Sequence, residues 1–510
     1  MAEPPPYPAD RYGLEQAMFP AAPVAAPTRR WLILLLLLLG LTLRAYHYLR
    51  DRAVWQDEAG LLLSVLARDY QDLFLGRLDY HQAAAPLYLC VLKTVSLLLG
   101  DSSHALRLPS FVASCAALLL FLTVARRLLN PQALPWAVLL FAVSEQLLWH
   151  ASEAKAYSVD VLAAVVVLAV PCWLGSLRRR LLAYTILTPL LLLSSYPACF
   201  LCMGLLLAYL PDVCCLSRLR LSGAVDPLSR KRLGEPTPGT TWLTYGALAA
   251  TTAAFLVWLV LGPARCQHDA AIHSCWVACM PNWDRPWTVP GWLLLSPLEV
   301  CRYCCKPLGQ ILVLFVVPGA LFLWRAGERT MVRLMLAPIL LALAAACVHV
   351  YPFGGARVMA YAAPAILLLA AEGVPPVLAW LRARSRLACA GLIALLLLPA
   401  ASSLAQVLHP WSEADIPTAA DYVRTQRRDA DLILGNDVAQ QYYFRHLGPA
   451  FHLLDESPLP SPTGDRLWVV MTAALPRPER ERLASRFAPA GWRPQLQREF
   501  AFTTVLLFSR

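Results

Sequence analysis

Two adjacent carboxylates, Asp57 and Glu58, follow the first long apolar run of the chain, which ends near Tyr48. Acidic side chains this close to a membrane are costly unless they are solvated or used. Such a carboxylate suits the role of general base, taking a proton from the hydroxyl or amine of an acceptor, with a pKa that burial raises and nearby cations lower. An exposed loop pair without a chemical role explains the spacing equally well.

Three cations lie at other breaks between apolar runs. Lys155 suits a phosphate group as a point charge, but pairing with Glu153 or extension to the membrane surface accounts for it equally well. Arg357 follows a Gly-Gly turn and suits bidentate binding of a phosphate, with contact to a lipid headgroup as the alternative. Arg107 stands at the start of a further apolar run, where it also serves to anchor a helix.

Aromatic and histidine side chains accompany these charges in the same short segments. They are candidates for the wall of a substrate pocket, although aromatic residues at this level often form only an interfacial belt. His81 is open to the same alternative. The candidate pocket residues are Tyr80, His81, His150, Glu153, Tyr157 and Tyr351.

Six cysteines cluster between residues 263 and 308, whereas the others lie inside apolar runs as small buried hydrophobes. Their spacing resembles a zinc site, but in an oxidising outer compartment disulfides are the simpler interpretation. The chain has no phosphate-binding loop, dinucleotide fingerprint or H-E-x-x-H motif. The clustered residues are Cys266, Cys275, Cys279, Cys301, Cys304 and Cys305.

The composition identifies the elements that must position these residues. Of 510 residues, 58% are hydrophobic and 15% are charged, and the mean hydropathy is +0.52. Soluble domains carry about 25% charged residues, so this composition excludes a soluble multidomain protein, a disordered chain and a collagen-like repeat. A polytopic α-helical membrane protein remains.

The formal net charge is +11. From His409 onward basic and acidic residues are equal in number, so the excess belongs to the apolar part, where it forms short arginine clusters between runs. This is the pattern of cytoplasmic loops and not of a nucleic-acid-binding surface. We therefore expect no nucleic-acid partner.

A transmembrane helix needs about 20 apolar residues, and the sequence contains about twelve such runs. The two runs between 181 and 212 are short and meet at Ser195-Tyr196-Pro197. The predicted spans lie near 31–49, 84–100, 105–125, 133–149, 157–175, 181–195, 197–212, 241–262, 309–324, 333–350, 358–380 and 387–408.

We assign the arginine clusters to the cytoplasm and the candidate site to the opposite side of the membrane. The prediction is a disordered cytoplasmic tail (1–28), a transmembrane domain (29–408) and an extracytoplasmic α/β domain (409–510). In the last, helices are expected over 416–427 and 479–487 and strands at 431–435, 467–471 and 503–508. The outer loops are 50–83, 101–104, 150–156, 263–308 and 351–357.

In arrangement, residues 30–410 resemble the GT-C membrane glycosyltransferases, and most closely the bacterial members of the protein O-mannosyltransferase and lipid A aminoarabinose transferase superfamily. The Asp57-Glu58 pair and the Gly-Gly-x-Arg turn ending at Arg357 are the more specific matches. The others are His81 to Tyr88, Arg107-Leu-Pro-Ser110, Ser152-Glu-Ala-Lys-Ala-Tyr-Ser158 and a soluble domain after the last span.

The resemblance implies a sugar donor carried on a polyprenyl phosphate, a lipid, glycan or protein acceptor, and inversion at the anomeric carbon. Asp57 would be the general base, with Glu58 orienting the acceptor or a cation. Lys155, Arg357 and Arg107 would hold the donor phosphate. The resemblance implies a bacterial inner membrane with the site facing outward. It indicates no particular cofactor and leaves a divalent metal ion possible.

Two family lysines are missing from this chain. Ala84-Ala85-Pro86 stands where aminoarabinose transferases carry Lys-Pro-Pro, and Ser195-Tyr196-Pro197 stands where many relatives have a lysine. These departures argue against a standard lipid A aminoarabinose transferase. The alternatives to a glycosyltransferase are a secondary transporter or lipid flippase, which would bind substrate near the membrane midplane, and a non-catalytic membrane scaffold.

Overall fold

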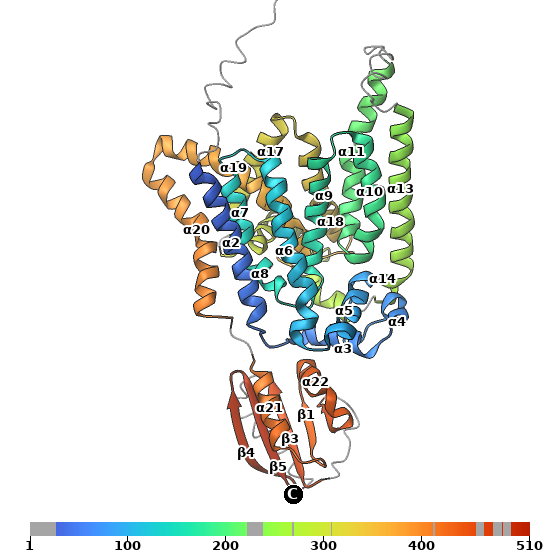
Figure 1. Cartoon of the computed structure of the whole chain (residues 1–510), viewed down its shortest axis with the longest axis vertical. Helices are drawn as coiled ribbons and strands as arrows, with labels where there is room; N and C mark the ends of the chain where they lie inside the picture. The colour runs from blue at the N-terminus through green and yellow to red at the C-terminus, as the bar shows by residue number, and fades with distance from the viewer. Residues whose placement is uncertain are drawn as a thin grey trace, which may run out of the picture.

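A computed structural model describes residues 27–221, 238–267, 270–307, 309–411, 414–454, 464–472, 482 and 491–510. A bundle of long helices forms one part of the molecule, and a small α/β domain lies against one end of it (Figure 1). Nearly all of the predicted N-terminal tail (1–28) and the helix predicted over 479–487 fall outside the described residues.

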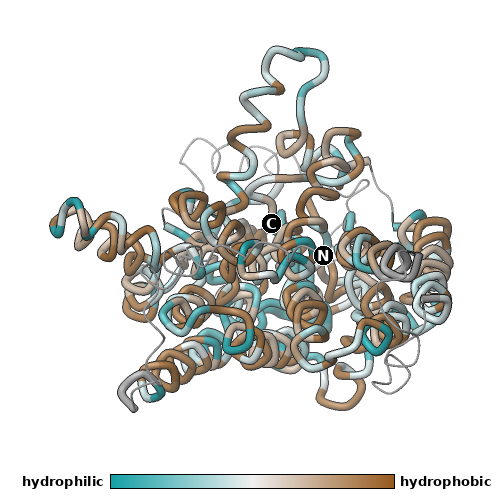
Figure 2. The backbone as a smooth tube through the Cα atoms, turned by 90° about the horizontal axis from the view of Figure 1, so that it is seen from above, coloured by the Kyte–Doolittle hydropathy of each residue, from teal (hydrophilic) through white to brown (hydrophobic). Residues whose placement is uncertain are grey.

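Seven of the described helices are long and apolar enough to cross a membrane, and a bent pair over Pro286–Cys304 and Gly309–Arg325 would make eight. The prediction of a polytopic helical membrane protein is thereby confirmed, whereas the number of twelve spans is not. Hydrophobic residues cover the helices at the periphery of the bundle (Figure 2). The seven are α2 (Pro27–Leu49), α6 (Ser103–Leu128), α11 (Ala198–Leu221), α13 (Pro238–Leu261), α18 (Arg329–Cys347), α19 (Ala363–Arg384) and α20 (Arg386–Leu408).

The span predicted at 84–100 is wrong. This segment forms α5 (Pro86–Leu99), whose 14 residues extend only about 21 Å, short of the roughly 30 Å hydrocarbon core. Both of its ends lie at the same end of the bundle, because the Ala84 N–H donates to Gln267 and Asp101 contacts Tyr442 of the C-terminal domain. Twelve spans, an even number, would return the C-terminal domain to the side of the N-terminus. Without this crossing, the chain places the N-terminus of α2 and the C-terminal domain at opposite ends of the bundle (Figure 1).

The span predicted at 133–149 is broken into α7 (Leu134–Ala142) and α8 (Glu145–Ala151). Arg44, which is fully buried in α2, explains the break. Its guanidinium donates to the carbonyl oxygens of Phe141 (3.3 Å) and Ala142 (3.2 Å) and to Ser114 Oγ (2.9 Å). These bonds satisfy carbonyls that the end of α7 leaves without a helical partner.

Short elements form the end of the bundle that faces the C-terminal domain. The shorter helices α9 (Tyr157–Trp173), α10 (Leu177–Ser194) and α17 (Val313–Arg325) also belong to the bundle, where they pack on α6, α13 and α19 in turn. The elements at this end, called the rim below, are α3 (Gln56–Ala67), α4 (Tyr70–Leu75), α5, α14 (Pro263–Cys266), α15 (Ala270–Trp276), α16 (Val289–Cys304) and the 3-10 helices η1 (Val277–Cys279), η2 (Pro286–Thr288), η3 (Gly309–Leu312) and η4 (Arg357–Ala362).

The C-terminal domain is a five-stranded sheet of order β2-β1-β3-β5-β4. β1 is parallel to β2 and β3, whereas β5 is antiparallel to β3 and β4. The predicted α/β class is confirmed. The sequence did not predict α22, β2 or β4. Strand β4 (Arg493–Phe500) is mostly exposed. The elements are α21 (Ile416–Gln426), β1 (Leu432–Gly435), α22 (Val438–Phe444), η5 (Arg445–Ala450), β2 (Phe451–Leu453), β3 (Arg466–Thr472), β4 and β5 (Thr503–Ser509).

Helix α22 joins this domain to the rim by packing on α3, the helix that carries Asp57. Ala439 and Tyr442 of α22 share an apolar cluster with Val54 and Leu62. Tyr443 accepts a hydrogen bond from the Val54 N–H at 2.8 Å. The C-terminal domain therefore supports the segment that leads into the candidate site.

Candidate active site

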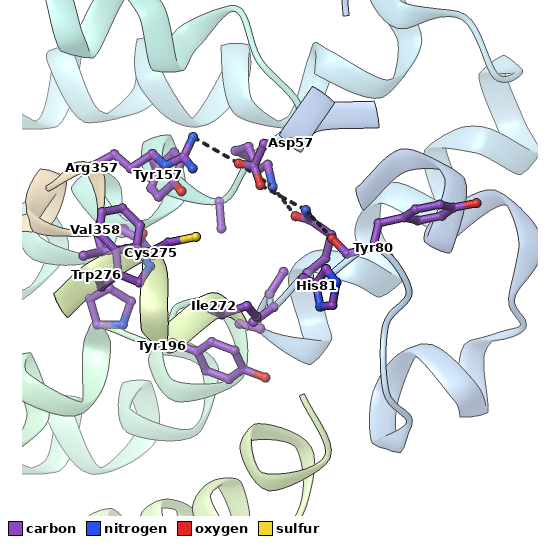
Figure 3. Close-up of a pocket in the computed structure, with 18 of the residues that line it drawn as sticks. Asp57, Tyr80, His81, Tyr157, Tyr196, Ile272, Cys275, Trp276, Arg357 and Val358 are labelled. Atoms are coloured by element: carbon purple, nitrogen blue, oxygen red, sulfur yellow. Dashed lines mark hydrogen bonds and ion pairs between the residues drawn. The ribbon is translucent and has the colours of Figure 1, made fainter. Parts of the chain in front are cut away.

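A cavity of about 780 Å³ opens at the rim, and Asp57, Lys155 and Arg357 are among its lining residues. Its walls come from distant parts of the sequence: α3, the segment before α5, the start of α9, α15 and the turn at 351–358. Figure 3 shows Asp57 and Arg357 facing each other across part of this space. We call it the first cavity.

Asp57 is the centre of a compact charged group. Its Oδ2 lies 3.0 Å from Lys155 Nζ and 3.1 Å from Arg357 Nη1. Its Oδ1 accepts a hydrogen bond of 3.0 Å from Gln82 Nε2. The carboxylate stands in the first turn of α3, where a negative charge is favoured by the helix dipole.

The ionisation of this group follows from its neighbours. Burial by itself would raise the pKa of Asp57, but Lys155, Arg357 and Gln82 outweigh it, and the pKa is lowered from its ordinary value. Burial lowers the pKa of Lys155, and the Asp57 charge only partly opposes this. At neutral pH Asp57 is therefore ionised, and its carboxylate lies between the side chains of Lys155 and Arg357.

Lys155 is held from two sides. It lies in the turn between α8 and α9, and only 6% of the residue is exposed. Besides Asp57 it contacts Gln82, whose Oε1 accepts a hydrogen bond of 2.5 Å from the ammonium. Lys155 thus pairs with Asp57 and not with Glu153, the partner that the sequence left open.

Arg357 is positioned by aromatic rings and by its turn. The guanidinium carbon lies 4.8 Å from the ring centre of Trp55 and 5.7 Å from that of Trp276. Gly354 adopts a φ of 118°, a backbone conformation that residues other than glycine rarely adopt. The turn and the two rings therefore hold the Arg357 guanidinium beside the Asp57 carboxylate.

Glu58 and Arg107 form a separate pair behind the cavity wall. The Arg107 Nε and Nη2 each donate to the Glu58 carboxylate at 2.7 Å, and both side chains are buried. The Ala154 N–H also donates to Glu58, and Arg107 donates further to Asp51. Neither lines the first cavity. The structure thus places Arg107 with Glu58 and away from the predicted phosphate site.

His150 and Glu153 also lie behind the wall. His150 Nδ1 and Glu153 Oε1 are 2.5 Å apart, and the other ring nitrogen of His150 contacts the Tyr303 hydroxyl. Burial alone would raise the pKa of Glu153, but His150 and then Arg52 lower it to about 2. Tyr303 donates to the Arg357 carbonyl, so this buried chain supports the backbone at Arg357.

The other predicted pocket residues, Tyr80, His81, Tyr157 and Tyr351, line the first cavity. The Tyr80 side chain extends away from Asp57 (Figure 3). Tyr80 and His81 both have left-handed backbone conformations, with φ of 56° and 53°. Such conformations are uncommon for residues other than glycine and often mark functional segments.

The lining residues that the sequence interpretation did not assign to the site include Gln82, Asp160, Tyr196 and Trp276. Gln82 and the two aromatic residues carry no signal that separates them from ordinary loop residues. Asp160 does, because it is a lone carboxylate at the beginning of an apolar run, and an ionisable residue there is a candidate functional residue.

Metal ligands do not gather in the described part of the chain, where no group of three or more His, Cys, Asp or Glu side chains is placed to hold an ion. The disulfides expected among the loop cysteines are absent, since all of them are free thiols. Cys301, Cys304 and Cys305 are buried among apolar side chains, whereas Cys266 and Cys275 are exposed.

A second cavity of about 480 Å³ lies beside the first. The two share Cys275, Trp276 and Arg357 as lining residues, and the second adds Arg302 and Lys306. Arg357 therefore stands between two spaces that both reach the rim.

Comparison with known proteins shows which solved structures share this fold. No protein-family model matches the sequence, and no curated protein matches it significantly. The chain is similar in structure to ArnT from Cupriavidus metallidurans in the apo state, with a TM-score of 0.53, 12% identity and coverage of 94% of this chain and 98% of that one. The same protein bound to undecaprenyl phosphate gives a TM-score of 0.54, 11% identity and coverage of 95% and 98%.

A weaker likeness is to the oligosaccharyltransferase AglB from Archaeoglobus fulgidus, with a TM-score of 0.44, 14% identity and coverage of 86% and 62%. The likeness to ArnT extends over the bundle and the C-terminal domain together. The chain therefore has the GT-C fold of membrane glycosyltransferases, as the sequence indicated. At this level of identity the likeness establishes the fold.

Proposed function

We propose that this protein is an integral-membrane glycosyltransferase that moves a sugar from a polyprenyl-phosphate donor to an acceptor outside the cytoplasm. The observation that carries the proposal is the Asp57 carboxylate shared between Lys155 and Arg357 in a cavity at the rim. A carboxylate base next to two cations matches the needs of acceptor deprotonation and of an anionic leaving group.

In this proposal the donor phosphate binds to Lys155 and Arg357. Both cations now contact Asp57 Oδ2, so a bound phosphate would compete with the carboxylate for them. Guanidinium groups bind phosphates bidentately, and the ammonium adds a point charge. The similarity in fold to a protein crystallised with undecaprenyl phosphate supports this class of donor.

The chemical step follows from this arrangement. The acceptor hydroxyl or amine gives its proton to Asp57 and attacks the anomeric carbon from the side opposite to the phosphate. A new bond to the acceptor forms as the bond between the anomeric carbon and the phosphate oxygen breaks, so the configuration inverts. The bonding pair leaves with the polyprenyl phosphate, whose charge Lys155 and Arg357 stabilise.

The acceptor, which is a lipid, a glycan or a protein, needs a route that the donor does not fill. The second cavity offers one, because it meets the first cavity at Trp276 and Arg357. We place the site and the C-terminal domain on the outer face of a bacterial inner membrane, in keeping with the arginine clusters near the other end of the bundle.

The test uses purified protein and donors labelled in the sugar, namely polyprenyl-phosphate mannose and glucose, with a crude cell-envelope extract as acceptor. We expect label in the acceptor, release of unglycosylated polyprenyl phosphate and an inverted anomeric configuration by NMR. Lys155→Met should abolish transfer. Lys93→Met is the matched control, since Lys93 also lies at the rim but, within the described part of the chain, donates to the Val65 and Leu66 carbonyls and to no carboxylate.

The outcomes separate the proposal from its alternatives. A flippase would move the labelled donor across a vesicle membrane with the sugar-phosphate bond intact. A scaffold would leave the donor unchanged and would tolerate Lys155→Met. Either result contradicts the proposed transferase.

A further inference from the structure

Asp160 is a buried carboxylate that the proposed reaction does not use. It stands in the first turn of α9, lines the first cavity and is only 3% exposed. Its Oδ1 has no hydrogen-bond partner among the described residues. No other buried aspartate oxygen in that part of the chain lacks a partner. A buried polar atom without a partner is costly, and a ligand in the cavity would remove that cost.

The surroundings of Asp160 differ from those of the phosphate site. Tyr157, Tyr196, Pro197 and Tyr351 line the same cavity, so this part of the wall is rich in aromatic surface. The cations that can bind the donor phosphate, Lys155 and Arg357, are paired with Asp57 and not with Asp160. The first cavity thus offers an anion-binding group and a separate acidic and aromatic region.

The cavity wall also carries an unpaired donor. Trp55 Nε1 is buried and has no acceptor within the described part of the chain, and Trp55 lines the first cavity. A sugar ring offers hydroxyl groups that both donate and accept hydrogen bonds, and its C–H faces pack against aromatic rings. A lipid chain offers no hydrogen-bonding group, and a phosphate diester only accepts hydrogen bonds.

We propose that Asp160 is a sugar-recognition residue: its Oδ1 accepts a hydrogen bond from a ring hydroxyl of the donor sugar. Trp55 Nε1 donates to an oxygen of the same sugar. This inference rests on the proposed function and adds to it the residue that distinguishes a sugar-bearing lipid phosphate from the bare lipid phosphate. Asp160 is thus a determinant of specificity for the glycosyl group.

The experiment compares two probes on purified full-length protein, polyprenyl phosphate and polyprenyl-phosphate mannose, with the glucose analogue as a second sugar. Asp160→Asn should weaken binding of a sugar-bearing probe by about 10- to 100-fold, the scale of leaving a buried polar group without its hydrogen-bond partner. Binding of polyprenyl phosphate should stay the same, because the phosphate binds at Lys155 and Arg357 and not at Asp160. Equal loss of all probes, or no loss of any, would overturn the inference.

A second variant separates recognition from folding. Asp160→Leu removes an unpaired buried carboxylate, so we expect an unchanged or higher thermal midpoint together with the same selective loss of sugar binding. A falling midpoint with all probes weakened alike would mean that Asp160 is structural. Glu372→Gln is the matched control, because Glu372 also lies within a bundle helix but accepts a hydrogen bond from the Asn130 N–H. It should leave the preference for sugar-bearing probes unchanged.

A monodeoxy series identifies the hydroxyl. For the wild type, one deoxy-sugar donor should bind as weakly as the parent donor binds to Asp160→Asn, and the two changes combined should cost no more than either alone. Additive losses would contradict the contact. If the wild type transfers sugar while Asp160→Asn retains full discrimination, only this inference fails. If the wild type transfers no sugar from any donor, the proposed function fails.

Discussion

Asp57 and Glu58 are consecutive residues of α3, yet their carboxylates belong to different sites. Asp57 Oδ2 lies 3.0 Å from Lys155 Nζ in the first cavity, whereas Glu58 accepts hydrogen bonds of 2.7 Å from Arg107 Nε and Nη2 behind the wall. Successive helical residues point about 100° apart, which explains how one turn serves both sites. The pair therefore divides into a residue proposed for chemistry and a residue that holds the rim together.

Glu58→Gln should destabilise the protein. It breaks a fully buried ion pair and leaves Arg107 without its main partner, a change that typically costs about 3–5 kcal/mol of unfolding free energy. Thermal unfolding in detergent measures the effect, with Asp57→Asn as the control because Asp57 is partly exposed. Equal midpoints for the two variants would show that the buried pair contributes no more than the exposed one.

Arg357→Ala should weaken donor binding by about 1.5–3 kcal/mol, the value of a hydrogen bond to a charged group. Arg357→Lys should restore only part of the loss, because an ammonium lacks the planar face that Trp55 and Trp276 hold. The measurement is the donor KM at saturating acceptor. An unchanged KM in Arg357→Ala would remove this residue from the phosphate site.

The pH profile of kcat/KM reports the free enzyme. The pKa of Asp57 is lowered, so the base stays ionised and should give no acid limb between about pH 5 and pH 7. Burial lowers the pKa of Lys155, so activity should fall as pH rises, with a midpoint below the ordinary value of 10.5. Lys155→Arg should move that limb upward. An acid limb near neutral pH that shifts in Asp57→Glu would show that Asp57 titrates there and would contradict its lowered pKa.

Cys275 should report occupancy of the site. It is exposed, and it lines both cavities beside Trp276. A bulky maleimide should therefore inactivate the enzyme, and donor present during the reaction should protect it. Cys275→Ser should resist inactivation, whereas Cys266→Ser should not. Inactivation of Cys275→Ser at the wild-type rate would place the sensitive thiol elsewhere.

The sequence predicted the convergence of charges but not their pairing. Asp57, Lys155 and Arg357 were expected on one face because each lies at a break between apolar runs, and the structure brings them within hydrogen-bond distance. The role expected for Arg107 depended on charge alone. Sequence spacing does not reveal that Glu58 occupies its guanidinium.

Hydropathy also has limits for the fold. The run at 84–100 is as apolar as a true span, but it forms α5 at the rim, and only tertiary contacts such as Ala84 to Gln267 distinguish the two. The break between α7 and α8 depends on Arg44, a charge inside the first span. Asp160 was predictable in principle, since the sequence shows a carboxylate in an apolar run.

The most direct test of the account is a single-turnover measurement on Asp57→Asn with labelled polyprenyl-phosphate sugar already bound. Lys155 and Arg357 remain in this variant, so donor affinity should equal or exceed that of the wild type. We predict normal donor binding and no transfer of sugar to the acceptor. Transfer at a rate close to that of the wild type would contradict the assignment of Asp57 as the base.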